Sequence, residues 1–132
     1  MFLSLFTDRE RELFYALSLH LVESDGVITG EEKTLLESFK LESNGQVLRK
    51  LDETPNEIIN ELSLSNDKIK NCILLELVSL ALVDNHYTEN ERSIILKVVK
   101  NFNISEQKFE EIFSWVVKLK EMYSRIVELV EI

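Results

Sequence analysis

Acidic side chains recur at a fixed spacing in two similar stretches of this sequence, and they are the residues best suited to chemistry. Asp25 and Glu32 in the first stretch match Asp84 and Glu91 in the second, each 59 residues further along the chain. Clustered carboxylates suit hard divalent cations such as Ca²⁺, Mg²⁺ or Mn²⁺, so one hypothesis is a metal site shared by the two stretches. It would bring Asp25 and Asp84 together, with Glu31, Glu32, Glu89 or Glu91 nearby, and His20 or His86 could add a softer ligand. The alternative is structural: an Asp where a helix ends bonds loop N–H groups, and a Glu caps the next helix.

The two acidic stretches do not have the pattern of an EF-hand calcium loop. A loop beginning at either Asp would need oxygen ligands at its third and twelfth positions, the twelfth being a bidentate Glu. The third position is Val27 or His86, and the twelfth is Leu36 or Ile95. An EF-hand is therefore excluded, and any cation site must have a different arrangement.

No other chemical signature appears in the sequence. A Gly-rich phosphate loop, Gly-x-Ser-x-Gly, Cys-x-x-Cys and His-Glu-x-x-His are all absent, so we expect no enzyme. The formal net charge of −9 argues against a nucleic-acid partner and against docking on an anionic membrane. The sequence contains no run of about 18 apolar residues, which is the length that a membrane-spanning helix needs. The start of the chain lacks a basic region ahead of its apolar residues, so we expect no signal peptide and a cytoplasmic protein.

Four capping boxes mark where helices should begin. In each, a Thr is followed three residues later by a Glu. The Thr hydroxyl can accept from the backbone N–H of the Glu, and the Glu carboxylate can accept from the backbone N–H of the Thr. The pairs are Thr7 with Glu10, Thr29 with Glu32, Thr54 with Glu57 and Thr88 with Glu91. Together with the apolar periodicity they predict helices over 8–23, 30–41, 55–62, 66–83, 89–101 and 106–131.

These elements predict a single all-α domain over 1–132, a bundle of about six helices built from two similar units. Each unit is a helix, an Asp loop and a second helix, covering about 8–41 and 66–101, with 43–53 as a connector. With 45% hydrophobic and 30% charged residues, the composition is that of a globular domain able to bury a core.

The long C-terminal helix over 106–131 carries a wide apolar sector. One line of apolar residues alternates steps of three and four, as in a heptad repeat: Phe109, Ile112, Val116, Leu119, Tyr123, Ile126 and Val130. Trp115, Met122 and Leu129 form a second line at its edge. Either the helix packs against two neighbours in the bundle, or the Trp115 edge is a surface for another protein or for a second copy. The protein would then be a monomer or a homodimer.

The doubled motif resembles the TerB family of tellurite-resistance proteins and the N-terminal domain of a membrane-anchored J-domain co-chaperone. The resemblance covers the chain from Leu13 to its end and rests on 22–32 and, more weakly, on 81–91. Shared features are an Asp, a Gly, a hydrophobic residue two positions after the Asp, and Thr-x-x-Glu opening the next helix. The sequence departs from the pattern at Asn85, where Gly is usual, although Asn tolerates a left-handed backbone. Ser24 and Val83 also stand where a small Ala is usual.

The resemblance implies an all-α bundle in a cytoplasmic bacterial protein, grouped with stress and tellurite-resistance systems. It also implies an acidic cation site, formed here by Asp25 and Glu32 from the first unit and Asp84 and Glu91 from the second. A non-enzymatic module of this kind is the leading interpretation. The alternative is a protein–protein interaction scaffold that uses its C-terminal helix, with acidic loops that are purely structural.

Overall fold

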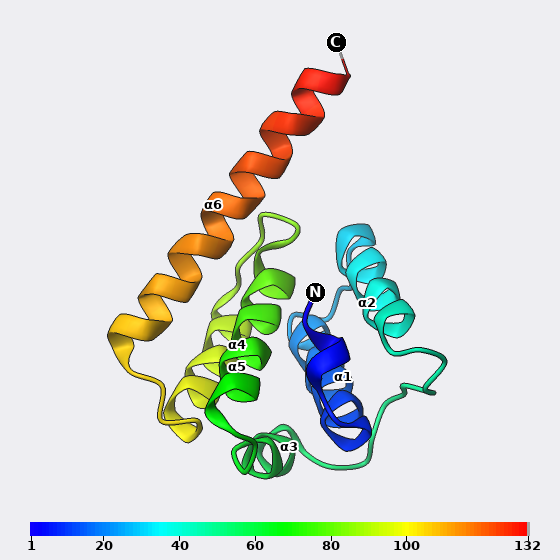
Figure 1. Cartoon of the computed structure of the whole chain (residues 1–132), viewed down its shortest axis with the longest axis vertical. Coiled ribbons are helices and arrows are strands. Elements are labelled where there is room, and N and C mark those ends of the chain that lie inside the picture. Colours follow the sequence, from blue (N-terminus) through cyan, green and yellow to red (C-terminus); the bar gives the residue numbers. More distant parts are fainter. Residues whose placement is uncertain (132) are drawn as a thin grey trace.

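The computed structural model describes residues 1–131, which form six α-helices and one 3₁₀ turn (Figure 1). The elements are η1 (Leu3–Leu5), α1 (Asp8–Glu23), α2 (Gly30–Glu42), α3 (Pro55–Leu62), α4 (Asp67–Leu82), α5 (Glu89–Asn101) and α6 (Glu106–Val130). Within the described residues there is no strand, so the predicted all-α class is confirmed. Each predicted helix begins and ends within one residue of its expected bounds, and 43–53 has no regular element.

The helices begin where the sequence predicts because their first N–H groups have side-chain partners. All four predicted capping boxes are present, with bonds in both directions between the Thr and the Glu. The two helices without a box are capped by Asn66, which accepts from the N–H of Ile69, and by Ser105, which accepts from the N–H of Lys108. Each cap satisfies a donor that a helix leaves unpaired at its start.

Helix α4 is the centre of the bundle, as its apolar residues on more than one side predict. Ile73, Leu74, Leu77, Val78 and Leu80 are all fully buried. Helices α1, α5 and α6 pack on α4, while α3 packs against α1 and α5. On the far side of α1, Phe14 stacks edge-on against Phe6 and Phe39, with ring centroids 5.8 and 5.1 Å away.

The N-terminal turn η1 is part of the core, and no sequence signal predicts it. Leu3 is fully buried, and the backbone around it is held by two long-range contacts. Arg11 Nε donates to the Leu3 carbonyl at 2.8 Å, and the Phe2 N–H donates to Glu76 Oε1 at 3.1 Å. A turn of three residues has too little periodicity of its own, so only its tertiary contacts define it.

Helix α6 is much longer than the helix that supports it. It has 25 residues against the 16 of α4, a difference of about 14 Å at 1.5 Å per residue. Its first half packs on α4, and its C-terminal half extends past the end of the bundle (Figure 1). The described part of α6 therefore includes a segment with little of the fold beside it.

The two threonines that begin the second helix of each unit give a direct test of capping. Thr29→Ala and Thr88→Ala each remove a hydroxyl that accepts the N–H of the glutamate three residues on. We expect each change to lower the free energy of unfolding by about 0.5–2 kcal/mol in denaturant titrations. Thr34→Ala is the matched control, since this exposed hydroxyl only donates back to a helix carbonyl, and it should cost under about 0.5 kcal/mol. Equal losses in all three variants would contradict the capping role.

Candidate functional site

The two Asp loops have the same local geometry. Asp25 Oδ1 accepts from the N–H of Val27 at 3.2 Å, and Asp84 Oδ1 accepts from the N–H of His86 at 3.0 Å. The residue after each Asp is left-handed, with φ of 84° at Gly26 and 64° at Asn85. Asn85 thus takes the backbone conformation that Gly takes in the first loop. In both loops one oxygen of the Asp is occupied in shaping the turn.

The two glutamates of the repeat are buried caps. Glu32 and Glu91 are each only 1% exposed. Glu32 Oε1 accepts from the N–H of Thr29 at 2.9 Å, and Glu91 Oε1 accepts from the N–H of Thr88 at 3.0 Å. Each carboxylate thus has one oxygen committed to the backbone. The second oxygen of Glu91 is buried and has no hydrogen-bond partner among the described residues.

The fold brings the two acidic loops together. Asn90 Nδ2, at the start of α5, donates to the Ser24 carbonyl at the end of α1 at 2.9 Å. This bond ties the second unit to the first, so the paired loops lie next to each other rather than at opposite ends of the bundle. The repeat in the sequence therefore corresponds to a juxtaposition in space.

The electrostatics reflect this proximity. Burial raises the pKa of Glu32, and the charges of Asp84 and Asp25 raise it further, although the bonds from Thr29 oppose the shift. Burial likewise raises the pKa of Glu91 to about 7, with Glu32 and Asp25 adding to the effect and the Thr88 bonds opposing it. All four acidic residues predicted from the sequence thus lie in one electrostatic neighbourhood. Because its pKa is about 7, Glu91 is the carboxyl group of this neighbourhood that can bind or release a proton near neutral pH.

The same neighbourhood is not arranged as a ligand set. Over residues 1–131, no group of three or more histidine, cysteine, aspartate or glutamate side chains could hold a metal ion. No such group among these residues includes either histidine; His86 is exposed, and His20 is half-buried. The sequence could not distinguish these outcomes, because capping and ligation use the same carboxylate oxygens.

The second candidate site runs along α6 from Trp115 into the projecting half of the helix. Five apolar residues follow one another at steps of four and three, and each is between 49% and 61% exposed. We call this set the α6 stripe: Trp115, Leu119, Met122, Ile126 and Leu129. Tyr123 and Val130 flank it and are exposed by 69% and 75%. Beside Trp115, the Lys118 ammonium lies 4.6 Å from the ring centroid.

The α6 stripe contains the predicted surface residues Trp115, Met122 and Leu129, and it adds Leu119 and Ile126. The predicted heptad line is buried only as far as Val116, so packing against two neighbours in the bundle does not hold for the C-terminal half. The two additional residues belong to the line that begins at Phe109, but they lie at its border with the Trp115 line. This position was the available signal that they would be exposed together with Trp115, Met122 and Leu129.

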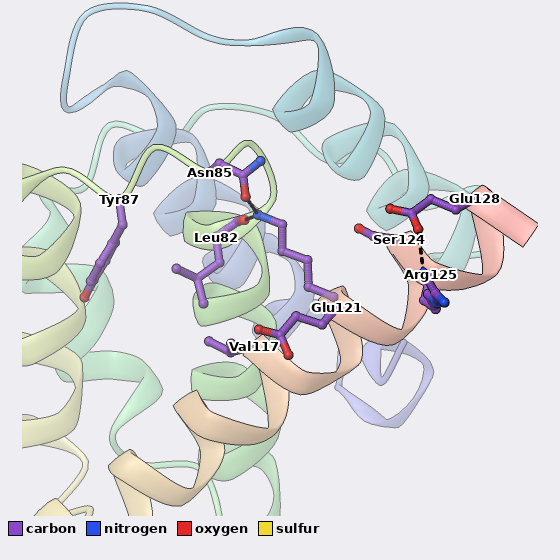
Figure 2. Close-up of a pocket in the computed structure, with 9 residues that line it drawn as sticks. Leu82, Asn85, Tyr87, Val117, Glu121, Ser124, Arg125 and Glu128 are labelled. Atoms are coloured by element: carbon purple, nitrogen blue, oxygen red, sulfur yellow. Dashed lines mark hydrogen bonds and ion pairs between the residues drawn. The ribbon is translucent and has the colours of Figure 1, made fainter.

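A groove of about 500 Å³ lies where α6 leaves the second Asp loop (Figure 2). Lys120 donates from α6 to the Leu82 carbonyl and to Asn85 Oδ1, so it fastens the helix to that loop. Further along the helix, Arg125 and Glu128 pair at 3.1 Å. The groove is open, and Leu82, Tyr87 and Val117 line it together with these polar groups, so it is an anchoring region rather than an enclosed ligand pocket.

No family model, curated protein or solved structure matches this chain. In the part of the chain that the structure describes, no helix is long and apolar enough to cross a membrane.

The raised pKa of Glu91 predicts a pH-dependent stability. A carboxyl group with a folded-state pKa above its ordinary value of 4.5 binds its proton more tightly in the folded protein. Its contribution to stability is therefore complete below about pH 4.5 and is lost as the pH rises to about 7. We expect Glu91→Gln to reduce this loss by on the order of 2 kcal/mol in denaturant titrations between those pH values, because Gln stays neutral and still accepts the Thr88 N–H.

Glu89→Gln is the matched control for this prediction, since it removes an exposed carboxylate from the same helical turn. It should leave the pH profile close to that of the unmodified protein. An unchanged profile in Glu91→Gln would contradict the raised pKa.

Proposed function

We propose that this protein is a non-enzymatic helical module that binds another polypeptide chain through the α6 stripe. The observation that supports this most directly is the exposure of five apolar side chains in heptad spacing on a helix that outruns its own bundle. Contiguous apolar patches of more than a few hundred Å² are uncommon on proteins that act alone, and they typically mark interaction sites.

The spacing of the α6 stripe favours a helical partner. Apolar residues at steps of three and four form a straight seam along one face of a helix, which is the pattern that a second amphipathic helix or a hydrophobic groove accepts. An acidic chain with no basic patch is unsuited to nucleic acid, which leaves protein as the partner class.

Site-specific photo-crosslinking tests this proposal in the cells that make the protein. A benzophenone amino acid in place of Met122, within the α6 stripe, should give a discrete crosslinked adduct, because the partner covers that side chain. The same amino acid in place of Ser124 is the control, since Ser124 is exposed on the other side of the same turn. Absence of an adduct at Met122, or equal adducts at both positions, would overturn the proposal.

A second candidate function is a TerB-like module of a cytoplasmic bacterial stress or tellurite-resistance system, which reads a divalent cation through Asp25, Glu32, Asp84 and Glu91. Two observations favour it: neighbouring carboxylate charges help to raise the pKa values of Glu32 and Glu91, and one buried oxygen of Glu91 is unpartnered in the described structure. A cation there would relieve the repulsion. Against it stands the use of the other glutamate oxygens in capping.

Thermal unfolding in millimolar Ca²⁺, Mg²⁺ or Mn²⁺ tests the cation function. Binding to the folded state alone would add about 2.7 kcal/mol at a hundredfold excess over Kd, so the melting temperature should rise. Asp25→Asn should blunt the rise, whereas Asp67→Asn, which removes an exposed carboxylate at the start of α4, should not. Melting curves that match those in NaCl of equal ionic strength would remove this candidate.

A further inference from the structure

We propose that the occupant of the α6 stripe is the same stripe of a second copy, paired as a parallel two-stranded coiled coil. The inference rests on the proposed interaction function and names its partner. It would place the two globular bodies at one end of a symmetric dimer, with the projecting helices side by side.

The residues of the α6 stripe fit the core positions of a two-stranded coiled coil. Leu119 and Ile126 fall at position a of the heptad, while Trp115, Met122 and Leu129 fall at position d. A Leu at d with a β-branched Ile or Val at a favours two parallel strands. The pair Ile126 and Leu129 has that combination at the tip of the helix.

The charges beside the stripe favour the parallel orientation. The g positions are Lys118 and Arg125, and the e positions in the projecting half are Tyr123 and Val130. In an antiparallel pair g faces g, so a Lys118 of one copy would meet Arg125 of the other, and like charges would repel. In a parallel pair g faces e of the other copy, so the basic side chains meet apolar or aromatic ones, and Lys118 can lie on a Tyr123 ring.

The bundle leaves room for this pairing. At 3.6 residues per turn, the stripe lies roughly a third of a turn away from the face that holds Phe113, Val116 and Lys120 against the fold. Two stripes can therefore face each other while the bodies point outward. The described structure has the helix tip extending clear of the bundle (Figure 1).

The net charge of the chain does not oppose the contact locally. Residues 117–131 carry three basic and three acidic side chains, so the projecting segment is neutral although the chain as a whole has a net charge of −9. The acidic excess lies elsewhere in the chain, and at physiological salt charges more than about 8 Å apart are largely screened.

The apolar area is close to what a weak to moderate dimer requires. The α6 stripe with Tyr123 and Val130 presents on the order of 700 Å² of apolar surface, against about 800 Å² per partner in a standard interface. Because obligate dimers bury more than this, we expect monomer and dimer to exchange reversibly.

Sedimentation velocity of the full chain between about 1 and 200 µM tests the dimer. The unmodified chain should shift from monomer to dimer across this range. Leu119→Glu with Ile126→Glu should raise the dimer Kd by at least about 100-fold, because charges would enter the seam. Ser124→Glu adds the same kind of charge to the same stretch, on the other side of the helix, and should leave the Kd within about threefold. Matching circular dichroism and melting curves will establish that each variant is folded.

The orientation has a separate readout. In a Cys72→Ala background, Leu129→Cys should form a disulfide between copies under mild oxidation, since equal d positions face each other only in a parallel pair. Ser124→Cys, away from the seam, should not. Crosslinking at both positions or at neither would overturn the parallel arrangement.

The results that would overturn the dimer differ from those that would overturn the proposed interaction function. A chain that stays monomeric at every concentration, or a dimer that the double variant leaves intact, would overturn pairing through the α6 stripe. If Met122 then crosslinks to a different protein in cells, the proposed interaction function survives. If Met122 crosslinks to nothing, both are wrong.

Discussion

The burial of α4 is the constraint on which the rest of this structure depends. A helix that is apolar on several sides must be covered on those sides, and α1, α5 and α6 provide that cover. The platform it offers is about 24 Å long, whereas α6 is about 38 Å long. Because the bundle cannot support the full length of α6, an apolar helix end must project into solvent unless something else covers it. The exposed α6 stripe is thus a consequence of unequal helix lengths around one central helix.

Local signals made most of the fold predictable. The capping boxes need only a Thr and a Glu three residues apart, and all four appear as expected because the bonds are made within one turn. Tertiary choices were not predictable in the same way. Two apolar lines overlap on α6, and their spacing does not say which one meets the bundle. The buried turn at Leu3 was missed for the same reason, since its order comes from contacts with Arg11 and Glu76.

The residue types of the acidic loops predict two alternatives and do not decide between them. Matching carboxylates in a repeat predict either capping or cation binding, because both use the same oxygens. In the fold, one oxygen of each glutamate is used for capping, and the Asp oxygens shape the turns. What the sequence could not reveal is that Glu91 is buried and that the other unit lies beside it. Burial, with a smaller effect from the charges of Glu32 and Asp25, raises the pKa of Glu91 to about 7. A proton and a cation would compete for this neighbourhood, so the apparent affinity for any cation would increase with pH.

The projecting half of α6 is a helix that its own interactions can barely maintain. An isolated helix of fewer than about 12 residues is marginal in water, and the Arg125–Glu128 pair adds only about 0.2–0.5 kcal/mol. The costly first turn is already formed, however, because α6 is packed on α4 and fastened by Lys120 to the loop at Asn85. The helix can therefore extend from an anchored base without a nucleation cost, while its apolar side stays open to solvent. A partner that covers the α6 stripe would bury that apolar surface and suppress fraying in the same step. Binding of such a partner would thus be coupled to local folding at this end of the molecule. Because Lys120 already holds the base of the helix, fewer residues of α6 would have to become ordered when the partner binds.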